Sequence, residues 1–185
     1  MNTPPRLNDS QRKIAVHLAR EAIRNYLTTR KETPFPSHEF LMTPGAAFVT
    51  LKLQDELRGC IGSTEAKFPL GQTIVQCAIS AAFRDPRFPP LSMEEFERIH
   101  LELSVLSPMH EIASVEEIQV GVHGIFLTLG NHRGLLLPQV AVELEWDRET
   151  FLKSTCQKAG LPPEAWQYPG VKIEIFSAEV FGEKE

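Results

Sequence analysis

The chain has 185 residues, of which 42% are hydrophobic and 23% are charged, and its formal net charge is −5. This length fits one medium domain or two small lobes packed together, and the composition is ordinary for a soluble globular protein. Basic and acidic residues are interspersed. This distribution excludes a strongly electropositive nucleic-acid-binding protein but leaves a local basic patch open.

No apolar run approaches the roughly 18 residues that a membrane span requires, so no association with a membrane is expected. Residues 1–7 lack a positively charged segment followed by an apolar core, and no secretory signal is expected. The three cysteines are widely spaced and odd in number, which favours a reducing, cytoplasmic location over a disulfide framework. Neither Cys-x-x-Cys nor His-x-x-x-His occurs, so no metal site is expected, and nothing points to a cofactor.

The first half of the chain is predicted to form helices, a hairpin and an alternating strand. Asn8 and Gln11 fit a capping box ahead of apolar residues at helical spacing, and Ser92 and Glu95 fit a second one. A run of prolines rules out regular structure between the later elements. In chain order, the elements are a helix over residues 10–29, a hairpin over 47–53 and 57–61, a helix over 69–83, an irregular loop over 85–90, a short helix over 92–99 and a strand over 101–105.

The second half is predicted to repeat this order. A strand over 124–129 is followed by a turn and a return strand that Pro138 ends. Asp147 is a good N-cap for a helix with Gly160 as its C-terminal signal. Residues 171–175 then alternate as a last strand.

The two halves also resemble each other in sequence. Phe48-Val49-Thr50-Leu51 and Phe126-Leu127-Thr128-Leu129 match closely, and an Arg-Gly pair follows each of them. These features favour an α+β fold with mainly antiparallel sheets and two intimately packed subdomains, approximately residues 8–110 and 111–185. The halves are interpreted as a degenerate duplication of a hairpin-helix-strand unit. The alternative is that hairpins and helices alternate by chance, as they do in many α+β proteins.

The segment Leu57-Arg58-Gly59-Cys60-Ile61-Gly62 is the strongest candidate site. Glycine weakens a strand, so two glycines at nearby positions indicate a close approach to the backbone, and they are expected to leave room beside Cys60. Arg58 lies two residues away, on the same face of a regular strand, where its charge would stabilise a thiolate. The alternative is that Cys60 is a small buried hydrophobic residue, which is the preferred interpretation for Cys77 and Cys156.

The second candidate is the loop Arg84-Asp85-Pro86-Arg87-Phe88-Pro89-Pro90. A proline-rigid loop with two arginines suits the binding of a carboxylate or phosphate, because guanidinium groups bind such oxyanions through paired hydrogen bonds. Asp85 would instead pair with one of the arginines or cap the following turn. Both interpretations stay open.

Weaker candidates lie in the second half. Pro138 and Gln139 follow a strand and would line a pocket. His123 and His132 flank the second hairpin and would serve as acid or base, although exposed turn histidines usually have no such role.

Several of these strings occur together in one known family. The hexapeptide at residues 57–62, the loop at 85–90 and the segments 103–108, 134–140 and 156–161 together resemble the AMMECR domain family, over about residues 10–181. The resemblance implies an α+β fold of two unequal subdomains with the hexapeptide near their junction. It also implies candidate functional residues, namely Arg58, Gly59, Cys60, Gly62, Asp85, Arg87, Phe88, Pro138 and Gln139. His123 departs from the family pattern, which puts a role for this hairpin entry in doubt.

The chain resembles the stand-alone bacterial and archaeal form of the family, which is similar to a component of the AmmeMemoRadiSam system. This resemblance implies Memo-type and radical S-adenosylmethionine proteins as partners. The leading hypothesis is an enzyme or enzyme subunit in which Cys60 is a nucleophile or attachment point. Arg58 would activate the thiol and Arg87 would orient an anionic substrate. The alternative is a non-catalytic binding module for a peptide, a nucleotide or RNA, or a protein partner. RNA binding would use the arginines Arg20, Arg24, Arg84 and Arg87.

Overall fold

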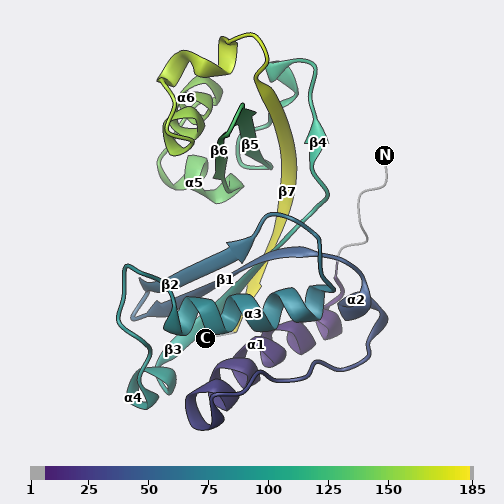
Figure 1. Cartoon of the computed structure of the whole chain (residues 1–185), viewed down its shortest axis with the longest axis vertical. Helices are drawn as coiled ribbons and strands as arrows, with labels where there is room; N and C mark the ends of the chain where they lie inside the picture. The colour runs from purple at the N-terminus through teal and green to yellow at the C-terminus, as the bar shows by residue number, and fades with distance from the viewer. Residues whose placement is uncertain (1–6, 184–185) are drawn as a thin grey trace. The chain divides into compact units, whose positions relative to one another are not determined.

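The structure, a computed structural model, describes residues 7–183, and these residues form two compact units (Figure 1). The N-terminal unit consists of residues 7–106 and 179–183, and the C-terminal unit consists of residues 107–178. Both units combine helices with antiparallel strands, which confirms the predicted α+β class. The last strand, β7 (Lys172–Gly182), contributes its first part to the C-terminal unit and its end to the N-terminal unit.

In the N-terminal unit, two helices cover one face of a sheet (Figure 1). The sheet order is β2, β1, β3 and the end of β7, and β1 pairs antiparallel with both β2 and β3. The elements are α1 (Asp9–Thr29), α2 (Glu39–Met42), β1 (Ala46–Leu53), β2 (Glu56–Ser63), α3 (Leu70–Phe83), α4 (Met93–Phe96) and β3 (Ile99–Leu106).

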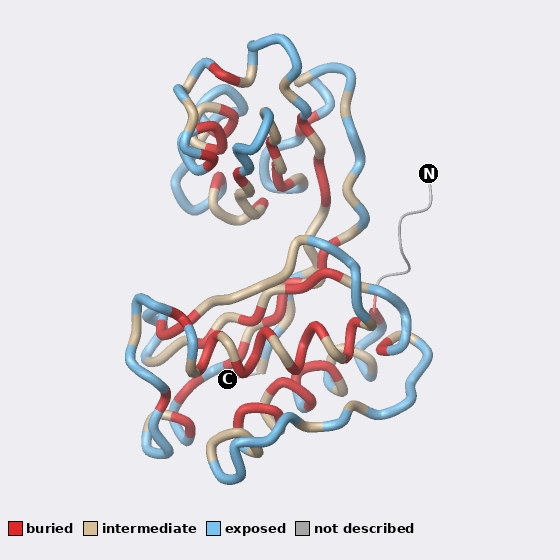
Figure 2. Tube along the Cα trace, viewed as in Figure 1, coloured by how far each residue is buried: buried red, intermediate tan, exposed pale blue. Residues whose placement is uncertain are grey.

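The core of this unit follows from the two periodicities in the sequence. Val49 and Leu51 alternate along β1 with half-buried residues, and both are fully buried against the helices. Ala19 and Ile23 lie on the apolar stripe of α1 and are also fully buried, whereas its opposite face is exposed (Figure 2). Burying one side chain of the size of Ile23 contributes about 1.5–3 kcal/mol.

The predicted helix starts are confirmed. Asn8 and Gln11 form the capping box of α1, and Ser92 and Glu95 form that of α4. The short helix is nevertheless shorter than the predicted 92–99, because its last residues turn into β3 at Ile99. The proline-rich stretch 85–90 contains no helix or strand, as predicted.

In the C-terminal unit, β5 pairs antiparallel with β6 on one side and with β7 on the other, while two helices pack on these strands (Figure 1). Phe151, Leu152 and Cys156 fill its core from α6. The elements are β4 (His110–Glu111), the 3-10 helix η1 (Val115–Glu117), β5 (His123–Leu129), β6 (His132–Leu136), α5 (Pro138–Glu143), α6 (Arg148–Lys158) and the 3-10 helix η2 (Pro163–Gln167).

In the C-terminal unit, the end of the return strand before Pro138 is confirmed, whereas the extent of the last strand is wrong. Pro138 does follow the return strand, but it also begins α5, because a proline suits the first position of a helix. The last strand was predicted over 171–175 and extends to Gly182. Asp147 caps α6 as predicted, through a hydrogen bond from the N–H of Thr150. Each unit contains a hairpin that is followed by a helix and then by a strand. That this order arose by duplication remains a prediction.

Candidate functional site

The hexapeptide occupies β2, which is the outer strand of the sheet in the N-terminal unit. The loop 85–90 closes its open edge at Cys60. The N–H of Cys60 donates to Oδ2 of Asp85 at 2.9 Å, and Nη2 of Arg87 donates to the carbonyl of Cys60 at 3.4 Å. These two side chains supply the donor and acceptor that a neighbouring strand would otherwise provide, and so they protect the edge.

Asp85 is the centre of this contact and is only 4% exposed. Its carboxylate accepts hydrogen bonds from the backbone N–H, Nε and Nη2 of Arg87 at 3.1, 3.0 and 2.7 Å. These bonds, with the N–H of Cys60, hold the pKa of the Asp85 carboxyl well below its usual value. The same contact raises the pKa of Arg87. Of the two open interpretations of this loop, internal pairing of Asp85 with an arginine is therefore the one observed.

Arg58 is held by a second, separate ion pair. Its Nε and Nη2 donate to the two carboxylate oxygens of Glu95 at 2.7 and 2.9 Å, and Nη2 also donates to the carbonyl of Pro89 at 2.9 Å. Bonding to Arg58 lowers the pKa of Glu95 from 4.5 to about 2. Arg58 therefore fastens the proline loop and the start of α4 to β2, and the arginine is itself buried.

The predicted position of Arg58 beside the thiol rests on regular strand alternation, which the structure does not have here. Leu51 pairs with Gly59 and Lys52 pairs with Leu57, so that Arg58 is the extra residue of a β-bulge. Its hydrogen bonds within the described residues run to Glu95 and Pro89, and none of them runs to the sulfur of Cys60. Spacing in the sequence cannot reveal a bulge, because the extra residue depends on how the two strands are registered.

The thiol of Cys60 is half-buried and contacts β1. Thr50 lies opposite Cys60, and its hydroxyl donates to Sγ at 3.3 Å. On its other side Thr50 pairs with Glu102 of β3, which forms an ion pair with Lys52 at 3.1 Å. The thiol of Cys60, the hydroxyl of Thr50 and the carboxylate of Glu102 thus lie next to one another on three neighbouring strands, on the face of the sheet opposite the helices.

The two glycines do not leave free space beside Cys60, which corrects that expectation. A Cβ on Gly59 would lie 2.2 Å from the carbonyl oxygen of Ala81 in α3, and a Cβ on Gly62 would lie 2.2 Å from the ring of Phe48. The close approach that glycine indicated is therefore made by the protein itself. Ile61, between them, packs on the edge of the core.

Phe88 joins the two halves of this cluster. Its ring lies 5.7 Å from the guanidinium carbon of Arg58 and 5.5 Å from that of Arg87, within the range of cation–π contacts. Arg84 is directed elsewhere, because its guanidinium lies near the ring and the hydroxyl of Tyr26 in α1. The cluster thus contains Arg58, Cys60, Asp85, Arg87 and Phe88, but the side chain of Arg84 does not join it.

Pro138 and Gln139 belong to the C-terminal unit, where they form the first turn of α5. Pro138 is buried and Gln139 is half-buried there. His123 begins β5 and accepts a hydrogen bond at Nδ1 from the N–H of Gln119. His132 begins β6, and its Nδ1 lies 3.2 Å from the carbonyl oxygen of Ala159.

Cys77 and Cys156 are core residues, as preferred from the sequence. Each is buried on a helix, and burial raises the pKa of both thiols, that of Cys77 to about 11. Within residues 7–183, no group of three His, Cys, Asp or Glu side chains is placed to hold a metal ion. No helix in the same range is long and apolar enough to cross a membrane.

Glu95 and Thr50 belong to the site, but neither was predicted as a site residue. Glu95 carries a sequence signal, because it completes the capping box with Ser92, but its second role as the partner of Arg58 depends on tertiary contacts. Thr50 carries only the signal of a polar residue in the strand that precedes the hexapeptide, and strand register determines its contact with Cys60.

Comparisons with known proteins identify a family and several relatives that are similar over nearly the whole chain. Residues 16–181 match the AMMECR1 family. A protein from Methanopyrus kandleri is 46% identical over 183 residues, covering 94% of this chain and 88% of its own length. A protein from Methanocaldococcus jannaschii is 44% identical over 180 residues, covering 93% and 90%.

A solved structure is similar as well. The crystal structure of an uncharacterised protein from Pyrococcus horikoshii superposes with a TM-score of 0.91 at 40% identity, covering 96% of this chain and 94% of that one. The protein described here belongs to the AMMECR1 family.

Proposed function

We propose that the protein is an enzyme subunit that acts with Memo-type and radical S-adenosylmethionine proteins, and that Cys60 is its reactive group. The observation that carries the proposal is the fixation of Cys60. Asp85 and Arg87 bind its peptide group, while Thr50 donates a hydrogen bond to its sulfur. A reactive group needs such preorganisation, since small displacements lower the rate.

The neighbouring groups have distinct roles in this proposal. The Thr50 hydroxyl orients the sulfur of Cys60 through its hydrogen bond, and Arg87 holds the backbone of Cys60 through its carbonyl oxygen. Nη1 of Arg87 makes no hydrogen bond within the described residues, so it is available to an anionic substrate. Arg58 is a positioning residue, because it holds the loop through Glu95 and Pro89.

The same proposal includes a reducing, cytoplasmic location. Cys60, Cys77 and Cys156 are all free, and a half-buried free thiol such as Cys60 persists best where thiols are kept reduced.

A second candidate is a non-catalytic binding module for a peptide, a nucleotide or RNA, or a protein partner. It is favoured by the internal pairing of both arginines and by the filled space at Gly59 and Gly62. In this case the cluster is a rigid platform, and Cys60 is a small residue that fits within it.

Alkylation separates the two candidates. The native protein is treated with iodoacetamide at pH 7, and the rate at Cys60 is followed by mass spectrometry against glutathione, with Cys77 and Cys156 as buried internal controls. The enzyme proposal predicts that Cys60 reacts faster than glutathione and that Thr50→Val slows it, while Thr50→Ser does not.

Replacement of the thiol gives the second readout. In a complex reconstituted with the two partner proteins, Cys60→Ser is expected to retain assembly and abolish turnover. Full turnover by Cys60→Ser, together with a rate at Cys60 no faster than that of glutathione, would leave the binding module as the function.

A further inference from the structure

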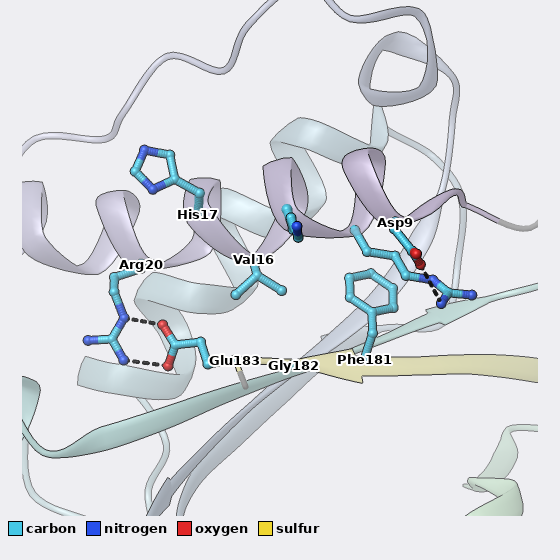
Figure 3. Close-up of a pocket in the computed structure, with 9 residues that line it drawn as sticks. Asp9, Val16, His17, Arg20, Phe181, Gly182 and Glu183 are labelled. Atoms are coloured by element: carbon cyan, nitrogen blue, oxygen red, sulfur yellow. Dashed lines mark hydrogen bonds and ion pairs between the residues drawn. The ribbon is translucent and has the colours of Figure 1, made fainter. Parts of the chain in front are cut away.

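A pocket of about 540 Å³ lies in the N-terminal unit, between α1 and the end of β7 (Figure 3). Its size is within the range of ligand pockets, which is about 300–1,000 Å³. The lining residues are Asp9, Arg12, Lys13, Val16, His17, Arg20, Phe181, Gly182 and Glu183.

The helical residues of this pocket lie three or four positions apart, so they form one stripe along α1. Val16 points from the helix toward the pocket, and Phe181 rises toward it from β7 (Figure 3). The stripe from Asp9 to Arg20 spans about 16 Å of helix axis. An extended chain covers this distance with about five residues.

Below the stripe, one side of the end of β7 has no strand partner within residues 7–183, and this side is called the open edge. On one side, the N–H of Glu183 donates to the carbonyl of Leu101 in β3 at 3.0 Å. On the opposite side, the pairing of β7 with β5 ends at Ser177, and residues 178–182 have no strand partner there within the described part of the chain. Unpaired strand edges bind extended peptides by adding them to the sheet.

The basic residues that line the pocket differ in whether they already have hydrogen-bond or ion-pair partners. Arg20 donates to Glu183 at 2.6 Å and to the carbonyls of Phe96 and Ile99, while Arg12 donates to Glu179 at 2.7 Å. Lys13 is exposed and has neither a hydrogen bond nor an ion pair within residues 7–183. Lys13 thus offers an unpaired positive charge midway along the stripe, while the exposed Asp9 at the start of the stripe contacts Arg12 at 3.4 Å.

We propose that the pocket and the adjoining open edge of β7 together form a groove, and that this groove binds an extended segment of a partner protein. The segment adds to the open edge of β7 and places an acidic side chain against Lys13. Val16 and Phe181 contact an apolar side chain of the same segment. The proposal goes beyond the function of Cys60, because the groove and the hexapeptide lie at opposite ends of the strand order β2, β1, β3, β7.

The probe is a blocked, fluorescein-labelled peptide Thr-Val-Glu-Val-Thr, and its matched control carries Lys in place of Glu. Fluorescence polarisation of the native protein is expected to show about tenfold tighter binding of the Glu peptide, equivalent to 1.4 kcal/mol. Lys13→Glu is expected to reverse this preference. Lys31→Glu, which changes an exposed lysine outside the pocket, is expected to leave it unchanged.

Strand addition is tested separately from charge. Alternation from Glu183 directs the N–H of Val180 toward the open edge, so Val180→Pro removes a donor there without breaking a bond to β3. This variant, checked for folding by its thermal melting, is expected to lose peptide binding. The Glu peptide with an N-methylated central amide serves the same purpose without altering the protein.

Two results would overturn the proposal. One is the absence of saturable binding of the Glu peptide up to millimolar concentration. The other is binding that free glutarate matches in affinity and that neither Val180→Pro nor N-methylation weakens, because that pattern describes a site for small anions only.

Discussion

The two edges of the sheet in the N-terminal unit differ in how they are completed. At the β2 edge, Asp85 and Arg87 bind the peptide group of Cys60, and Arg58 and Glu95 fasten the loop that carries them. At the β7 edge, residues 178–182 have no strand partner opposite β3 within the described residues. An exposed edge is a liability in any sheet. The comparison therefore contrasts an edge that the chain's own side chains complete with an edge to which, as proposed above, a partner segment adds.

The difference is also visible in the charges. The β2 edge uses ion pairs whose members include the buried Arg58 and Asp85. The pairs at the β7 edge have no fully buried member, because the side chains of Arg12 and Glu179 are 35% and 19% exposed and those of Arg20 and Glu183 are 20% and 22% exposed. Buried pairs are costly to break, whereas exposed pairs contribute little. Substitutions at the two edges should therefore differ in effect.

The largest effect is expected from Gly59→Ala at the closed edge. The new Cβ would meet the backbone oxygen of Ala81 at 2.2 Å, and backbone cannot move aside without shifting α3. We expect a loss of about 2–3 kcal/mol in the free energy of unfolding, measured with urea. Gly62→Ala is the matched control, because it meets the side chain of Phe48, which can rotate, and it should cost about 1 kcal/mol. Equal losses would contradict the assigned packing of Gly59.

A smaller effect is expected from removing one carboxylate at each edge. Glu95→Gln leaves the buried Arg58 without its counter-charge and should cost about 2 kcal/mol. Glu179→Gln, its counterpart at the open edge, should cost less than about 1 kcal/mol. Equal costs in urea unfolding would remove the energetic difference between the edges.

The ion pair between Arg58 and Glu95 also makes the free energy of unfolding depend on pH. The pKa of Glu95 is lowered in the folded state from 4.5 to about 2, so its contribution to stability is complete above pH 4.5 and is lost as the pH falls toward 2. The free energy of unfolding should therefore fall more steeply over this range in the unmodified protein than in Glu95→Gln. Parallel curves would show that Glu95 titrates alike in both states.

Much of the fold was predictable because local signals agreed with the tertiary structure. Asn8, Ser92 and Asp147 each begin a helix as the sequence indicates, since capping depends on neighbours in the chain. The short α2 and α5 were missed because neither spans two full helical periods. The second half of β7 was missed because its contacts lie far away in the sequence.

The sequence indicated which segments form the site, but it did not indicate which of their residues contact one another. The hexapeptide and the loop 85–90 carry distinctive residues, and both are indeed part of one cluster. Arg58 binds Glu95 and is the extra residue of a bulge, and Gly59 faces Ala81 because α3 packs closely on β2. Gly134 in the second hairpin is similar, because a Cβ there would lie 2.6 Å from the carbonyl oxygen of Thr155. Contacts of this kind depend on the whole fold.

The closed edge is tested most directly by hydrogen exchange at the backbone N–H of Cys60, measured by NMR in the unmodified protein and in Asp85→Ala. The bond from this N–H to Asp85 predicts that Cys60 is protected in the unmodified protein. In Asp85→Ala its protection should fall by about tenfold or more, while that of Val49 in the central strand changes only with overall stability. An unprotected Cys60 in the unmodified protein, or equal protection in both, would contradict the closure of this edge by Asp85.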